Sequence, residues 1–346
     1  MSTAELHGNV SEDRPATEQS ELLSRKISEL SLVIPGTRLE ALILQLYQEL
    51  ESADISFRPK TYLSDEWGCP QGVPVIGIPF YLADPKLAGL EGQLTDIEAE
   101  NEAEVMMYLR HEAGHAFNYA YRLYIKPGWR RLFGRFSRPY KEKYQPHPFS
   151  VRFVHNIPGW YAQKHPDEDF AETFAVWMTP RAQWRKRYKG WGAMKKLLYM
   201  ERIGKKFSNV EPFVAHGTAD ITVEQMYVTV ADFYDKAAEQ QLSPGDLTLD
   251  TDLMDIFNAS RRRKKGVRPA IDFLRENRKT ITDKVTYWTG VQRPLLKKLM
   301  EAIESRVAEL KLNVDITGER QHLTELVAYM TALAMNYISR GKFVQP

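Results

Sequence analysis

The stretch VMMYLRHEAGHAFNYAY, residues 105–121, constrains the fold of this chain more than any other segment. His111 and His115 stand four residues apart, so on an α-helix their rings project from one face a single turn apart. Most positions around them are apolar or small, which predicts a helix, from about 102 to 124, that is buried on most of its faces. Buried histidines and a buried Glu112 need polar or ionic partners. A second element must therefore pack against this helix and supply them.

The pattern H-E-x-x-H provides two nitrogen ligands for zinc and a carboxylate that acts as a general base. Glu112 lies about 100° around the helix from His111, where it reaches a water on the ion without binding the ion itself. Gly114 costs about 1 kcal/mol in a helix interior relative to alanine, so another element is expected to pass close to it. Because five-letter matches also occur by chance in exposed amphipathic helices, a zinc site requires a third ligand.

The metzincin pattern H-E-x-x-H-x-x-G-x-x-H is excluded, because Asn118 and Tyr121 occupy the positions of its glycine and its third histidine. The competing solution takes a glutamate from a second helix, and the stretch HPDEDFAETFAVW, residues 165–177, offers several acids. Glu168 and Glu172 are four apart and share a helix face. We expect Glu168 to be the third zinc ligand.

Glu172 is expected to accept the ring N–H of a ligating histidine and so to orient that ring, as carboxylates beside metal ligands do. His165 is a rival third ligand, although its position before Pro166 favours a place in the turn that precedes the helix. The sequence predicts one zinc ion per chain, held by two histidines and one glutamate.

Taken together, HEAGHAFNYAY and YAQKHPDEDFAETFAVW resemble the zinc-binding metallopeptidases of bacteria, a gluzincin-type group related in motif to the protease domain of anthrax lethal factor. The resemblance covers residues from about 55 to 200. It implies a thermolysin-like core, in which a small sheet pairs its edge strand with substrate beside the two helices; we place that strand at 77–82. It also implies that Tyr161, seven residues before Glu168, helps to stabilise the oxyanion. Because Cys69 is the single cysteine, the chain departs from relatives that carry a cysteine-rich zinc ribbon.

The chain has 346 residues, of which 43% are hydrophobic and 27% charged, and a formal net charge of +2. These values predict a globular protein with one large or two moderate domains. Residues 1–20 are polar and acidic, which predicts a disordered lead rather than a secretory signal, and hence a cytoplasmic location. The most apolar late segment, residues 323–337, is short for a membrane span and contains Glu325, so it predicts a core helix.

The predicted fold is α+β and mainly helical, with a small sheet in a gluzincin-like zinc peptidase core. Short strands are expected at 55–59 and 72–84, and a helical pair at 21–51, broken at 34–36. The metallopeptidase core is expected to span 21–218, with a basic, partly irregular insertion at 125–160. A helical region without a counterpart in the family is expected at 219–346.

These features predict a zinc metallopeptidase that hydrolyses a protein or peptide substrate. The alternative is a catalytically weak or inactive scaffold of the same fold that binds an acidic partner or nucleic acid through its basic surface. From 126 to 196, Lys and Arg outnumber Asp and Glu roughly three to one, with aromatic residues interleaved. Three interpretations of this stretch stay open: a surface that binds nucleic acid, the rim of a groove that attracts an acidic partner, and a solvated insertion. Cys69 is read either as a shield for the zinc or as a thiol without such a role.

Overall fold

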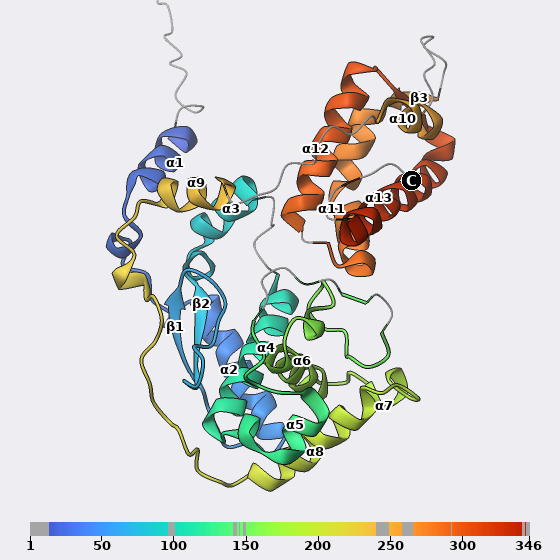
Figure 1. Ribbon diagram of the computed structural model, residues 1–346. Helices are drawn as coiled ribbons and strands as arrows, with labels where there is room; N and C mark the ends of the chain where they lie inside the picture. The colour runs from blue at the N-terminus through green and yellow to red at the C-terminus, as the bar shows by residue number, and fades with distance from the viewer. Residues whose placement is uncertain are drawn as a thin grey trace, which may run out of the picture.

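A computed structural model describes residues 14–95, 101–140, 144, 146–147, 150–239, 249–257, 266–291, 293–340 and 343. This part of the chain is mainly helical and holds two small two-stranded sheets, so the predicted class, α+β and mainly helical, is confirmed (Figure 1). None of the helices in these ranges combines the length and the apolar character that crossing a membrane requires.

The predicted disordered lead, residues 1–20, lies outside the described residues from 1 to 13, and the chain is helical from residue 14 to 20. Helix α1, Arg14–Ser24, occupies that part of the chain and packs against α9, Val230–Glu239. Leu22 and Leu23 of α1 also contact the main hydrophobic core. Apolar burial against a helix more than 200 residues away in the sequence stabilises a segment whose own composition is polar.

The two predicted site helices are both present. Helix α4, Glu102–Ala120, begins at a capping box, in which the Asn101 side chain accepts from the Glu104 N–H and the Glu104 carboxylate accepts from the Asn101 N–H. Helix α6, Pro166–Met178, has proline in its first turn and ends before Thr179, as the sequence predicts. The two helices pack side by side in the core (Figure 1).

Gly114 lies where α4 closely approaches α6. A β-carbon at Gly114 would lie 2.8 Å from the Ala171 Cα atom and 3.0 Å from the Phe174 Cβ atom. The expectation that another element passes close to Gly114 is therefore confirmed. The absence of a side chain lets the helices approach closely enough for residues on both to reach one metal ion.

We expect Gly114→Ala to lower the free energy of unfolding by about 1–3 kcal/mol, because the added methyl group would overlap the α6 backbone. Gly89→Ala is the matched control, since Gly89 lies in helix α3, Pro85–Thr95, with open space around it. That change should stabilise the protein by up to about 1 kcal/mol. Urea unfolding of both variants measures the difference, and equal shifts in the two would contradict the close packing.

The sheet of the core consists of β1, Lys60–Ser64, and β2, Val75–Pro79, which run parallel. The predicted strand at 55–59 is therefore displaced, since pairing begins only at Lys60. The predicted edge strand at 77–82 is correct as far as Pro79 and wrong beyond it. After Pro79, which has no N–H for a ladder, the chain turns into the short helix η2, Phe80–Ala83.

The β2 edge that faces away from β1 is partly engaged by the chain itself. Gly77 exchanges both of its backbone hydrogen bonds with Gly68, at N···O distances of 2.7 and 3.3 Å. Trp67, next to Gly68, stacks on Tyr108 of α4, with ring centroids 5.6 Å apart. The segment around Gly68 therefore lies between the edge of β2 and the site helix.

The other helices of the core surround this arrangement. They are α2, Arg38–Ser52, α5, Pro127–Phe133, α7, Trp184–Arg187, and α8, Met194–Phe207, with the 3-10 helices η1, Ile27–Glu29, η3, Leu123–Ile125, η4, Tyr161–Gln163, and η5, Val223–Gln225. The predicted helical pair at 21–51, broken at 34–36, corresponds to α1 with η1 and to α2. The predicted basic insertion at 125–160 contains α5 and otherwise irregular backbone in its described residues.

The C-terminal region is a helical bundle with its own hydrophobic core (Figure 1). It comprises α10, Asp250–Ile256, α11, Ala270–Thr289, α12, Arg293–Glu309, and α13, Glu319–Arg340, with the antiparallel strands β3, Val267–Pro269, and β4, Asn313–Asp315. The predicted helical character is confirmed for these residues. Arg293 joins the bundle to α4 through an ion pair with Glu104 at 2.9 Å.

The boundary between the two cores falls later than the predicted position at 219. Val223, Met226 and Val230 belong to the main core, whereas the second core begins at Leu249. The sequence after 219 predicts helices throughout. The two cores can be told apart only by which residues the apolar face of each helix packs against.

Candidate metal centre

Three ligand atoms from α4 and α6 meet between the helices. The Nε2 atoms of His111 and His115 lie 3.1 Å apart, and the Glu168 Oε2 atom lies 3.0 Å from the first and 3.2 Å from the second. Tetrahedral coordination with bonds of about 2.0–2.1 Å separates ligand atoms by ~3.3 Å, which is close to this spacing. All three residues are buried, and together they form a group that could hold a metal ion. The structure thus brings together the three ligands that the sequence predicts.

Each histidine is oriented by a second carboxylate from α6. The Nδ1 atom of His111 lies 2.8 Å from Glu172 Oε1, and the Nδ1 atom of His115 lies 3.1 Å from Asp167 Oδ2. A carboxylate at Nδ1 holds the proton there, so the Nε2 lone pair is left for a metal. The position of Glu172 is as the sequence predicts.

Asp167 is a site residue that sequence reasoning did not assign. Asp167 and Glu168 are neighbours about 100° apart on a helix, so helical spacing alone does not place both beside the histidines. The acidic first turn of α6 was the available signal, but it is equally typical of an exposed helix N-terminus. Only the packing of α6 on α4 shows that both carboxylates face the site.

The two orienting carboxylates are themselves held in place. Asp167 accepts hydrogen bonds from the Tyr119 hydroxyl, at 2.5 Å, and from the Asn118 amide, at 2.7 Å. Glu172 accepts hydrogen bonds from the Asn156 side-chain amide and from the Ile157 backbone N–H, both at 2.9 Å. Burial and the Asp167 charge raise the pKa of Tyr119, so it remains a neutral donor. The histidine rings are consequently fixed by two layers of hydrogen bonds.

We expect Asp167→Asn to weaken zinc binding about 10–100-fold, because an amide holds the His115 ring N–H less firmly than a carboxylate does. Asp169→Asn is the matched control on the same helix, since Asp169 pairs instead with Lys196, at 2.6 Å. Competition with a chromophoric chelator measures the zinc affinity of both variants. Asp167→Asn with wild-type affinity would contradict the role given to Asp167.

The charge of the site favours a bound cation. Four buried carboxylates, those of Glu112, Asp167, Glu168 and Glu172, surround two histidines, and no Lys or Arg among the described residues forms an ion pair with them. Burial lowers the pKa of His111, but hydrogen bonds with Glu168 and Glu172 outweigh it and raise the pKa to about 9. A buried divalent cation would neutralise this excess of acids.

Glu112 differs from the other acids of the site, because its carboxylate has no hydrogen-bond partner in the described part of the chain. It is nevertheless buried and close enough to both histidines to interact with their charges. Burial raises the pKa of Glu112, so this carboxylate accepts a proton more readily than an ordinary glutamate does. These properties suit the predicted general base.

Tyr161 lies at the edge of the site, with its ring centroid 5.5 Å from that of His111. Its hydroxyl lies near that of Tyr140, and Tyr140 donates a hydrogen bond to the Glu168 Oε1 atom. Burial raises the pKa of Tyr161, so the phenol stays protonated. Sequence reasoning assigned no site role to Tyr140, because the segment around it shows no period that predicts where its side chain lies.

The rival ligand, His165, is the N-cap of α6. Its Nδ1 atom accepts from the Asp167 N–H at 3.1 Å, and its Nε2 atom donates to the Arg138 carbonyl at 2.8 Å. Both ring nitrogens of His165 therefore bond to groups outside the set of His111, His115 and Glu168.

The Cys69 thiol donates a hydrogen bond to the Val73 carbonyl at 3.2 Å, and burial together with the charges of Glu112 and Asp167 raises the pKa of this thiol.

Comparison of the chain with protein-family models, curated proteins and solved structures found no match in any of the three. Function is therefore inferred from the site residues and their geometry. The donor set, its spacing and the orienting carboxylates all fit a metal ion.

Proposed function

We propose that this protein is a zinc-dependent metallopeptidase that hydrolyses peptide bonds in a protein or peptide substrate. The observation that carries the proposal is the convergence of His111 Nε2, His115 Nε2 and Glu168 Oε2, with a carboxylate at each histidine Nδ1. Two imidazoles and one carboxylate suit zinc, whereas magnesium and calcium prefer oxygen ligands throughout. Three protein ligands are typical of catalytic zinc, which keeps a further position for water or substrate.

In the proposed reaction, bound zinc supplies a Lewis acid that lowers the pKa of water and polarises a carbonyl group. Glu112 accepts a proton from the attacking water and then gives it to the leaving amine. Tyr161 donates a hydrogen bond to the oxyanion that develops on the scissile carbonyl, a role supported by its protonated phenol beside His111. Asp167 and Glu172 keep the histidine rings in one orientation throughout.

The gluzincin-type family and its thermolysin-like core belong to the same proposal. It is supported by a glutamate that comes from a helix separate from the H-E-x-x-H helix, and by a small sheet whose strand β2 contacts the H-E-x-x-H helix. In this assignment a substrate strand pairs with β2 and has to replace or extend the bonds that Gly68 makes to Gly77. The cytoplasmic location and a part for the C-terminal bundle in substrate selection stay predictions.

The test is cleavage of a peptide library by the purified full-length protein. We expect close to one zinc per chain, cleavage at defined bonds, loss of cleavage after dialysis against a chelator, and recovery on addition of zinc. A protein that holds zinc and cleaves nothing would favour the scaffold alternative instead. In that case, binding of an acidic protein or of nucleic acid should weaken steeply as salt is added.

A further inference from the structure

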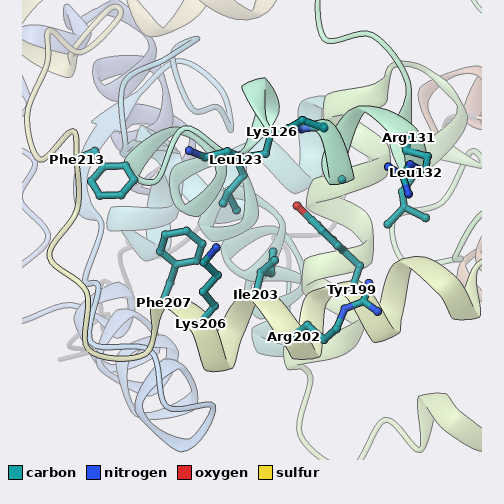
Figure 2. A pocket seen from close by; sticks show the side chains of 12 residues that line it. Leu123, Lys126, Arg131, Leu132, Tyr199, Arg202, Ile203, Lys206, Phe207 and Phe213 are labelled. Carbon is teal, nitrogen blue, oxygen red and sulfur yellow. The ribbon is translucent and has the colours of Figure 1, made fainter.

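A cavity with a volume of about 620 Å³ lies between α5 and α8, and none of its described lining residues belongs to the metal centre (Figure 2). Tyr199, Ile203 and Phe207 of α8 form one wall, at successive spacings of four residues. That spacing places them along one helix face, as an apolar stripe ~12 Å long. Leu123 and Leu132 add apolar surface to the same cavity. The volume lies within the range of small-molecule sites.

Four cations line the same cavity, namely Lys126, Arg131, Arg202 and Lys206, and none of its described lining residues carries a carboxylate. Figure 2 shows them distributed around the apolar residues rather than gathered at one point. In the part of the chain that the structure describes, none of the four side chains has an ion-pair or hydrogen-bond partner. By contrast, Arg185, on the neighbouring helix α7, pairs with Glu201 at 2.6 Å. Unneutralised cations around an apolar cavity attract a ligand that carries negative charge.

Tyr199 adds a polar group to the apolar wall. Its hydroxyl points toward the cavity in Figure 2 and has no hydrogen-bond partner among the described residues. Burial raises the pKa of Tyr199 to about 12, despite the nearby positive charge of Arg202, so the hydroxyl is a neutral donor at physiological pH. Phe213 also lines the cavity and is 55% exposed, which places an aromatic ring where the cavity meets solvent.

We propose that this cavity binds an amphipathic carboxylate of the fatty-acid class, with the apolar chain along the stripe from Tyr199 to Phe207 and the carboxylate at Arg202. Inorganic phosphate would leave the apolar wall unused. An acidic peptide would bring backbone N–H and C=O groups against hydrocarbon and ring surfaces that offer them few partners, at a cost in free energy. A single anionic head on an apolar chain matches both the charge and the apolar surface.

The test compares three ligands of equal chain length, decanoate, decanol and decylamine, by isothermal titration calorimetry on the full-length protein. Decanoate should bind at least about tenfold more tightly than decanol, as expected for a charge-assisted hydrogen bond, and decylamine most weakly. Equal affinities for decanoate and decanol would overturn the proposal. So would binding of a peptide of alternating Leu and Glu together with failure of decanoate to bind.

Substitutions test whether decanoate binds in this cavity. Arg202→Glu should weaken decanoate binding by about tenfold or more and leave decanol binding unchanged, because it reverses one cation of the cavity. Lys195→Glu is the matched control, since Lys195 is an exposed residue of α8 outside the cavity. Phe213→Ala, at an exposed position, should weaken decanoate and decanol by a similar factor. If Lys195→Glu weakened decanoate as much as Arg202→Glu does, binding would be a surface-charge effect and the site would be rejected. None of these measurements depends on peptide hydrolysis.

Discussion

Glu168→Ala protein is expected to bind zinc on the order of a thousandfold more weakly than the wild type. Zinc-binding free energies of about 10–16 kcal/mol are shared among a few ligands, so removal of one ligand atom costs several kcal/mol. The Glu168 Oε2 atom lies within 3.2 Å of both histidine Nε2 atoms, and it completes the group of three that could enclose an ion. The two histidines alone then leave the ion largely open to solvent.

Zinc content after dialysis, together with chelator competition, measures this effect, and circular dichroism checks that the helices remain. Glu172→Gln is the informative comparison, because Glu172 contacts a ligating histidine and not the ion. Its affinity should fall only about 10–100-fold. If Glu168→Ala kept wild-type zinc affinity, or if Glu172→Gln lost more zinc than Glu168→Ala, the ligand assignment would be wrong.

Glu112→Gln protein is expected to keep its zinc and to lose hydrolysis by about 10²–10⁴-fold, the range that general acid–base catalysis contributes. The amide has almost the shape of the carboxylate but cannot take a proton from water. Among the described residues, Glu112 has no hydrogen-bond partner that the substitution would remove. The effect should therefore appear in kcat and leave the fold and the metal unchanged.

Peptide cleavage by zinc-loaded Glu112→Gln and wild-type protein, at matched metal content, measures this difference. Asp169→Asn again serves as a control for a buried acid of the core that is not near the reacting groups. Equal cleavage by wild type and Glu112→Gln would exclude Glu112 as the base.

Much of the metal centre follows from helical spacing. Positions four apart share a helix face, so the sequence places His111 with His115 and Glu168 with Glu172, and Gly114 indicates a close neighbour. Asp167 and Tyr140 could not be found in this way. Asp167 adjoins Glu168 on the helix, and Tyr140 lies in irregular backbone, so their contacts depend on how separate segments pack.

The same division holds for the fold. The long helices α11, α12 and α13 are predictable because their apolar positions recur with the helical period. The predicted strand at 55–59 ends before β1 begins, and the predicted strand at 72–84 extends beyond β2 at both ends, because β-pairing depends on a partner strand as well as on local sequence. Helix α1 could not be predicted from its polar composition, because its contact with α9 depends on residues far away in the sequence. The predicted domain boundary falls too early for the same reason.

The sequence by itself determined which side chains share a helix face: His111 with His115 on one helix, and Glu168 with Glu172 on another. Only the tertiary structure decided that these faces meet, that Asp167 joins Glu172 in orienting the rings, and that four cations line an apolar cavity between α5 and α8. The physical reason is the separation along the sequence of the residues that interact. The helical period acts between residues three or four apart, whereas the meeting of two faces depends on long-range burial and close approach, here permitted by Gly114.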